Sequence, residues 1–459
     1  MTVQPEKLQR GLGLKEATAL NMIDMVGIGP FVVLPLVIQT MGGPQSIAAW
    51  VSGALLALID GFIWAELGAA MPRAGGSYVF LREAYGVERW GKLMSFLFIW
   101  QTMFQAPLVV ASGAIGFAQY LSYLIPLNNV TRKIASGSLV IVLIILLYRK
   151  ITTVGKMSLL LWIGVIGTMI WFIGGGLLHF KPELAFNYPE GAWDLSWPFF
   201  VALGQATVQT IYTYLGYYNV CHLGAEIRDP ARNIPRSIFI SIIGIAILYL
   251  AMQFSVLGAI PWQEAQNSQF IVSTLIERLY GPQAANIATM LVLWIAFSSL
   301  FALLLGYSRI PYAAALDGNF FSVLAKVHPT KQFPHVSLLA VGLTGFVFSL
   351  LFRLSDAIRA ILAMRILVQF IGGAVGTIIL RRTWGAERLP FRMWFFPVPA
   401  VVAIFAWGSI LLSTGRNFAL AGVGVMIAGA VVFLIRARRR GEWPFAEQIP
   451  LRREDTKKH

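Results

Sequence analysis

Long apolar segments follow one another along almost the whole chain. An α-helix needs roughly 20 apolar residues to cross a bilayer, and about twelve segments approach or exceed that length. With 57% hydrophobic and only 12% charged residues, the chain is far more apolar than a soluble domain. The sequence therefore predicts an all-α integral membrane protein with about twelve transmembrane helices. These lie near residues 17–40, 45–70, 90–125, 133–148, 155–179, 196–222, 236–260, 284–315, 335–352, 356–380, 393–413 and 417–436.

The distribution of basic residues predicts how the chain is oriented. The formal net charge is +15, and most of the 36 lysines and arginines fall on the same side of the membrane as the amino terminus if twelve helices are present. Cytoplasmic loops carry such an excess. We therefore expect a multi-pass cell-membrane protein with both termini cytoplasmic and no nucleic-acid partner. Its basic tail could bind anionic lipid headgroups, but we interpret it as a stop-transfer anchor followed by a solvated segment.

Two apolar segments are interrupted at matching positions. In the first, residues 27–30 read Gly-Ile-Gly-Pro, and a proline there ends one helix and suits the first turn of the next. In the sixth, Gly216 lies among the polar and aromatic residues 213–219. Irregular backbone at membrane depth is tolerated where it lines a cavity. The matching positions favour a five-plus-five inverted repeat with helices 1 and 6 broken, although Gly and Pro are common in membrane helices anyway.

Broken helices of this kind suit both ends of an amino acid. Amides at the start of a half-helix, together with the positive end of its dipole, favour a carboxylate. Carbonyls of an unwound segment suit an ammonium group or a cation. We therefore expect the substrate to bind between the two interruptions.

Three segments resemble the amino acid–polyamine–organocation transporter superfamily. They are residues 66–78 (ELGAAMPRAGGSY) with Tyr85-Gly86 after them, residues 225–237 (AEIRDPARNIPRS) and residues 308–318 (SRIPYAAALDG). The resemblance implies ten core helices in two inverted repeats, followed by helices 11 and 12. The implied divisions are an amino-terminal cytoplasmic segment 1–16, a first repeat 17–180, a second repeat 181–382, helices 11 and 12 in 383–436, and a cytoplasmic tail 437–459.

The resemblance also implies site residues. The backbone at the first interruption would hold the substrate carboxylate, and carbonyls at the second would hold its amino group. Tyr212 or Tyr217 would close over the substrate, although either could instead be a packing residue or an interfacial anchor. The predicted substrate-binding residues are Gly27, Ile28, Gly29, Tyr212, Tyr214, Leu215, Gly216 and Tyr217.

Three residues are candidates for ion coupling. Asp24 lies one turn before Gly27, inside the hydrocarbon layer, where charge is costly. We expect it to carry a proton, although it could instead contact the substrate ammonium or pair with a base such as Arg365. Ser298 and Ser299 match hydroxyls that bind sodium in some relatives of the superfamily.

Two further positions bear on coupling and gating. Many relatives carry an acid where this chain has Tyr218. Some relatives carry a lysine inside helix 5, where this chain offers only Lys156. We interpret Lys156 as a positive-inside charge. Glu226 could form ion pairs with Arg228 and Arg232 that latch a gate, or the segment could only join helices. Arg309, in the third motif, completes the predicted gate residues Glu226, Arg228 and Arg309.

The expected function is secondary active transport of amino acids by alternating access, coupled to a proton or sodium or running as exchange. A polyamine or organic cation carrier of the same superfamily is the alternative. The five histidines are scattered and no phosphate-binding glycine-rich loop is present, so an enzyme or an ATP-driven pump is disfavoured. No cofactor and no metal site are expected.

Overall fold

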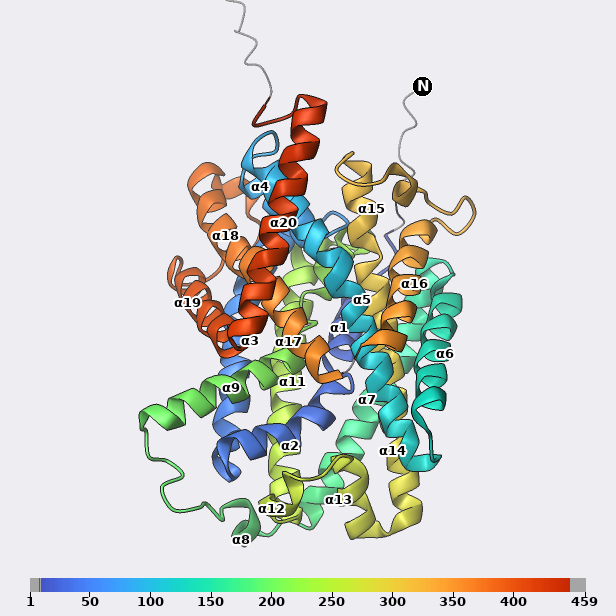
Figure 1. Ribbon diagram of the computed structural model, residues 1–459, viewed down its shortest axis with the longest axis vertical. Coiled ribbons are helices and arrows are strands. Elements are labelled where there is room, and N and C mark those ends of the chain that lie inside the picture. Colours follow the sequence, from blue (N-terminus) through green and yellow to red (C-terminus); the bar gives the residue numbers. More distant parts are fainter. Residues whose placement is uncertain (1–7, 9, 353, 446–459) are drawn as a thin grey trace, which may run out of the picture.

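The computed structural model describes residue 8, residues 10–352 and residues 354–445. Within them the regular elements are helices packed into one bundle, and the two isolated β-bridges join loops (Figure 1). Part of the predicted amino-terminal segment and most of the predicted tail lie outside the described residues. The helices are α1 (Leu14–Met25), α2 (Gly29–Met41), α3 (Ile47–Ala70), α4 (Ser77–Ala84), α5 (Trp90–Leu124), α6 (Asn129–Leu147), α7 (Ile151–Leu178), α8 (Pro182–Ala185), α9 (Trp197–Tyr214), α10 (Asn219–His222), α11 (Pro230–Ala259), α12 (Trp262–Ala265), α13 (Ile271–Tyr280), α14 (Pro282–Tyr307), α15 (Arg309–Leu316), α16 (His335–Leu351), α17 (Leu354–Arg365), α18 (Gly372–Thr383), α19 (Val398–Ser413) and α20 (Arg416–Arg440).

Many of these helices have the dimensions of membrane spans. In the described part of the chain, 8 helical stretches are long and apolar enough to cross a bilayer, or 9 if the bent pair α1 and α2 forms one span. The helices α16 and α19 are apolar but shorter. The predicted all-α, multi-pass membrane fold is therefore confirmed. The count of twelve and the division into two inverted repeats stay predictions.

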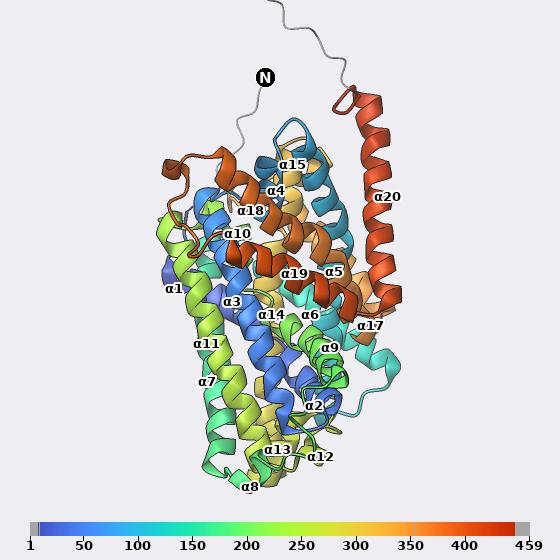
Figure 2. The ribbon, with the colours of Figure 1, turned by 90° about the vertical axis from the view of Figure 1, so that its left-hand side faces the viewer.

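Burial differs sharply between the centre and the edge of the bundle. In the stretch Pro282–Leu316, which contains α14, 72% of the most apolar window is buried, whereas the corresponding figure for α20 is 22%. Figure 2 shows α20 at the edge of the bundle, where it packs against α5 and α17. A helix that is apolar all round but little buried faces lipid. The apolar surface of α20 therefore suits the hydrocarbon layer.

The two ends of the bundle gather different elements. The helices α4, α15 and α18 and the carboxyl end of α20 lie at one end, and α8, α12 and α13 lie at the other (Figures 1 and 2). The described start of the chain lies at the end that contains α15. The backbone amides of Gly11 and Leu12 both donate to the carbonyl of Glu226 at 3.0 Å, and the Glu226 side chain pairs with Arg309 at the start of α15. The first described residues and the end of α20 are therefore on the same side.

Candidate substrate and ion site

The first interruption separates α1 from α2, whose axes differ by 45°. Residues 26–28 join them without forming helix, and Pro30 is the second residue of α2. A proline in the first turn of a helix removes no intrahelical hydrogen bond, because the first amides of a helix have no partner within it. A Cβ atom added to Gly27 would lie 2.7 Å from Ser299 Oγ, so glycine lets the chain approach α14 closely.

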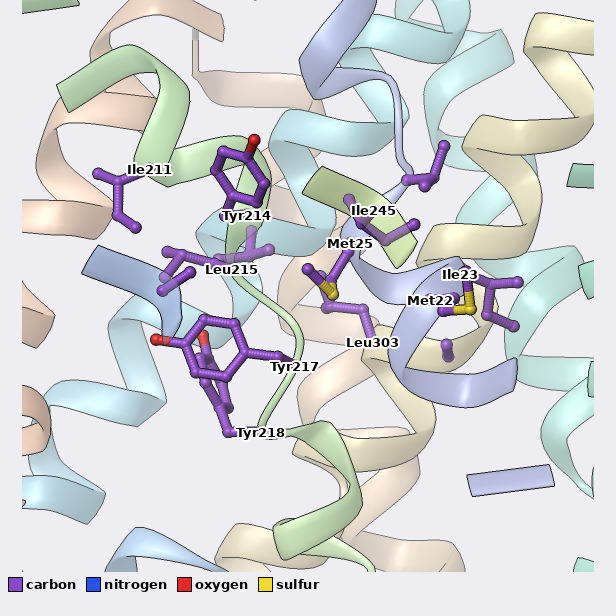
Figure 3. Close-up of a cluster of buried hydrophobic side chains, with 14 of the residues drawn as sticks. Met22, Ile23, Met25, Ile211, Tyr214, Leu215, Tyr217, Tyr218, Ile245 and Leu303 are labelled. Atoms are coloured by element: carbon purple, nitrogen blue, oxygen red, sulfur yellow. The ribbon is translucent and has the colours of Figure 1, made fainter. Parts of the chain in front are cut away.

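The second interruption separates α9 from α10. Leu215 is extended, with φ −62° and ψ 144°, and Gly216 has φ +126°, which side-chain-bearing residues rarely adopt. Figure 3 shows the non-helical segment between Leu215 and Tyr218 close to Met25. A Cβ atom on Gly216 would lie 2.9 Å from the amide nitrogen of Met25 and 3.0 Å from the carbonyl carbon of Asp24. The two interruptions therefore touch through a residue that must be glycine.

Hydrogen bonds fix the interrupted segments to each other and to their neighbours. The Tyr249 hydroxyl of α11 donates to the carbonyl of Met25 at 2.7 Å and lies 3.2 Å from the carbonyl of Thr213, so it touches both segments. The Val220 amide of α10 donates to Asn21 Oδ1 of α1 at 2.9 Å. Backbone groups freed by the loss of helix are thus partly satisfied by polar side chains, as the membrane interior requires.

A cavity of about 60 Å³ lies between the interruptions. Roughly 10–15 Å³ is enough for one water, so the cavity can hold more than a single solvent molecule. Its walls come from α1, α2, α5, α9, α14 and α17, and from the non-helical segments. The lining residues are Asp24, Met25, Gly27, Ile28, Gly29, Val109, Ser112, Gly113, Tyr212, Thr213, Leu215, Gly216, Tyr218, Ala296, Ser299, Leu300, Leu303, Tyr307, Ile361 and Arg365.

Two of the lining side chains, an acid and a base, can carry opposite charges. Asp24 is half-buried and Arg365 is 2% exposed. Within the part of the chain that the structure describes, neither forms an ion pair. The expected alternative of a direct Asp24–Arg365 ion pair is therefore not observed, although both side chains face the same cavity.

Arg365 is held in place by neutral groups. It ends α17 and is followed by a π-helical stretch, Ile366–Ile371, a type of irregularity often found at functional sites. Its Nε donates to Gln369 Oε1 at 3.0 Å, and its Nη2 donates to the Tyr218 hydroxyl. The guanidinium also lies 5.1 Å from the centre of the Tyr218 ring, within cation–π range.

Most of the predicted site residues meet at this cavity. Gly27, Ile28, Gly29, Tyr212, Leu215, Gly216, Asp24 and Ser299 all line it. Ser299 Oγ donates to the carbonyl of Asp24 at 3.1 Å, which brings both coupling candidates to the same turn of α1.

Three predicted residues point elsewhere. The Tyr214 hydroxyl donates to the carbonyl of Trp50 at 3.2 Å, and the Tyr217 hydroxyl donates to Asp60 Oδ2 at 2.6 Å. Ser298 Oγ donates to the carbonyl of Trp294 one turn earlier in α14, at 2.7 Å. None of the three lines the cavity. Of the two tyrosines expected to close over the substrate, Tyr212 is therefore the one at the cavity.

Sequence reasoning missed Asp60 and the position of Tyr218. Asp60 is fully buried in α3 and also accepts hydrogen bonds from Trp64 Nε1 at 2.7 Å and Trp407 Nε1 at 3.2 Å. An acid near the middle of the apolar segment 45–70, well before Glu66 at its end, is the signal that could have revealed it. The neighbouring Tyr217 and Tyr218 thus contact a buried acid and a buried base respectively.

The predicted latch has a different partner. Glu226 forms two hydrogen bonds with Arg309, Nε to Oε2 at 3.0 Å and Nη2 to Oε1 at 2.9 Å, and both side chains are at most 1% exposed. Arg228 and Arg232 are exposed, and neither forms an ion pair with a described residue. The expectation that they pair with Glu226 is wrong, because the start of α15 places the Arg309 guanidinium against that carboxylate.

A charged cavity between interrupted helices of a membrane bundle defines the class of secondary transporters. The chain belongs to the amino acid permease family, whose model matches residues 12–435. This match confirms the resemblance to the amino acid–polyamine–organocation superfamily that the three motifs indicated.

Individual relatives differ in substrate and in mode of transport. The chain is similar to the methylthioribose transporter of Bacillus subtilis (24% identical over 422 residues, 87% of this chain and 87% of the relative). It is also similar to the serine/threonine exchanger SteT of the same organism (22% over 448 residues, 96% and 100%). The aspartate-proton symporter of that organism is 25% identical over 383 residues (78% and 70%). Family membership therefore leaves the particular substrate open.

Proposed function

We propose that this permease moves amino acids across the cell membrane by alternating access, with both termini cytoplasmic, and that the cavity between the two interruptions is its substrate site. The observation that carries the proposal is the meeting of a helix amino terminus, an unwound segment, Asp24 and Arg365 at one cavity, where neither side chain forms an ion pair with a described residue. A zwitterion brings charges of both signs, which such a site can match.

The substrate carboxylate would bind the amides at the start of α2. The first amides of a helix have no acceptor within it, and its dipole favours an anion there. Glycine keeps this end of the helix open, because a Cβ atom on Gly29 would lie 3.4 Å from both Tyr212 Cε1 and Thr213 Cγ2. Tyr212 would close over the substrate, since its ring borders Gly29 and its hydroxyl lies 3.3 Å from Ser112 Oγ.

The substrate ammonium would bind on the opposite wall. Carbonyls of the unwound segment around Gly216 would accept from it. The Asp24 side chain lies against this segment, because a Cβ atom on Gly216 would come within 3.0 Å of Asp24 Cγ. Asp24 would also carry the coupling proton, because in the described residues no donor lies within hydrogen-bonding distance of its carboxylate. A sodium ion beside Ser299 and the carbonyl of Asp24 is the second candidate for coupling. Lys156 is exposed on α7 and does not line the cavity.

A polyamine or organic cation is a poorer fit to this cavity. Arg365 would repel a second positive charge in a site of low dielectric. The proposed cycle needs no cofactor, and none of the proposed roles is enzymatic.

Transport by purified protein in liposomes tests the proposal. Labelled amino acids and polyamines would be offered under an imposed proton gradient, an imposed sodium gradient and no gradient. We expect saturable uptake of at least one amino acid that a gradient or internal amino acid stimulates. Saturable uptake of polyamines without amino acids would overturn the assignment of substrate class, and uptake that does not saturate would indicate a channel.

A further inference from the structure

Arg365 directs unused hydrogen-bond donors toward the cavity. A guanidinium has five N–H donors in a planar fork. Here Nε binds Gln369 and Nη2 binds Tyr218, while Nη1 has no hydrogen-bond partner among the described residues. Because Arg365 lines the cavity, its Nη1 is the donor available to a ligand there.

In the described part of the chain, no carboxylate lies within ion-pair distance of Arg365, although the guanidinium is deep in the bundle and Asp24 lines the same cavity. Arginines inside membrane segments are costly and usually pair with an acid or a carbonyl. Arg309 in the same bundle obeys that rule through its two bonds to Glu226, and Arg381 obeys it through Glu66, at 2.6 Å. Arg365 forms no such pair with a described residue. Its counterion is therefore expected to arrive with the ligand.

The two groups that could bind anions have different neighbours in the cavity wall. The start of α2 borders Tyr212 and Thr213. The Arg365 guanidinium instead lies 5.1 Å from the centre of the Tyr218 ring and 5.8 Å from that of Tyr307. A substrate whose main-chain carboxylate binds the start of α2 would therefore direct a second group to Arg365.

We propose that Arg365 binds the side-chain carboxylate of an acidic amino acid, so that the substrates of this permease are aspartate and glutamate or close analogues. The inference rests on the proposed function, which places the main-chain carboxylate at α2. A guanidinium fork matches a carboxylate in two parallel hydrogen bonds, whereas an aliphatic side chain would leave the buried charge unpaired. Gln369 and Tyr218 hold the fork in position without neutralising it.

The charges in the cavity sum to zero when such a substrate is bound. Arg365 contributes one positive charge, an acidic amino acid has a net charge of −1, and Asp24 remains neutral if it binds one proton. Each substrate would then enter with one proton. Tyr212, Tyr218 and Tyr307 line the same cavity as Asp24, and the Tyr249 hydroxyl of α11 contacts the carbonyl of the adjacent Met25. The elements packed against α1 also carry the buried His222 of α10 and the exposed Lys156 of α7.

Competition between matched acid and amide substrates tests this assignment. Counterflow in liposomes would compare aspartate with asparagine and glutamate with glutamine, because each pair differs little in shape. We expect the wild type to prefer the acids by at least about tenfold, since a site built to bind a group rejects analogues that lack it. Arg365→Gln should reduce the preference to less than about threefold, and Arg365→Lys should keep part of it because the charge remains.

The control is Arg416→Gln, which removes an exposed arginine at the start of α20 and should leave the preference unchanged. A wild-type preference for asparagine or glutamine overturns the inference without any variant, as does an acid preference that survives in a folded Arg365→Gln protein. Transport of neutral amino acids alone would refute the role of Arg365 but leave the proposed function standing. A complete lack of amino acid transport would refute the proposed function itself.

Discussion

Two regions of this bundle each bury an arginine, but only one of the two arginines forms an ion pair with a described residue. At the end that contains α15, Arg309 is 1% exposed and is paired with Glu226 through two hydrogen bonds. At the central cavity, Arg365 is 2% exposed and touches only neutral partners, while Asp24 faces the same space without an ion pair to a described residue. The two arginines are equally buried, so they differ in pairing and not in exposure.

The difference separates structural charge from functional charge. A buried ion pair satisfies its own members, so it can join α15 to the segment after α10 without a ligand. An unpaired buried charge is costly, and such residues in membrane segments usually serve a substrate, an ion or a proton. The pair Glu226–Arg309 should therefore act mainly on stability, and Asp24 and Arg365 should act mainly on transport.

Removal of one member of the buried pair should have the largest effect on stability. Arg309→Leu leaves the Glu226 carboxylate buried without a cation, which should lower the free energy of unfolding by about 3–5 kcal/mol. Thermal unfolding of the purified protein in detergent would measure the loss. The double variant Glu226→Leu with Arg309→Leu should recover most of it, because no unpaired charge remains. A single variant as stable as the wild type would contradict the structural role.

Gly29→Leu should abolish substrate binding and spare the fold. A Cβ atom at this position already lies 3.4 Å from Tyr212 and Thr213, so a longer side chain would fill the space beside the first amides of α2. The matched control is Gly373→Leu in α18, where an added Cβ atom meets nothing within 4 Å. Equilibrium binding of the transported substrate would compare the two. Binding by Gly29→Leu within about a factor of three of wild type, roughly 0.6 kcal/mol, would contradict the assignment of the start of α2 as the carboxylate site.

Tyr249→Phe should have a smaller effect. The variant removes the hydroxyl that contacts the carbonyls of Met25 and Thr213, which joins the two interrupted segments to α11. A typical hydrogen bond contributes about 1 kcal/mol, so substrate affinity should fall by roughly fivefold while the protein stays folded. An unchanged affinity, measured by the same binding assay, would show that this hydroxyl does not set the geometry of the cavity.

The sequence predicted the bundle and the interruptions more fully than the contacts around them. Apolar length reveals a membrane helix directly, and residues 27–30 and Gly216 carry the local chemistry of a break. The loss of helical periodicity at such a break hides which side chains face the cavity. Tyr217 and Tyr218 are adjacent, yet the first binds Asp60 and the second lines the cavity with Arg365.

Long-range pairing was equally hidden from local patterns. The sequence around Glu226 offered Arg228 and Arg232 as neighbours, but the observed partner, Arg309, is 83 residues away. An exposed arginine gains little from an ion pair, whereas the buried fork of Arg309 can form two hydrogen bonds. Only the packing of α15 against the segment after α10 determines that choice.

Proton-driven uptake by Asp24→Asn in liposomes tests the functional half of the comparison most directly. The variant keeps the shape of the side chain and removes its charge, and Lys156→Gln serves as a control on an exposed charge of α7. We predict that exchange of internal for external substrate persists in Asp24→Asn while stimulation by a proton gradient disappears, and that Lys156→Gln behaves like the wild type. Full proton-driven uptake by Asp24→Asn with an unchanged pH profile would contradict the account, because another group would then carry the coupling proton.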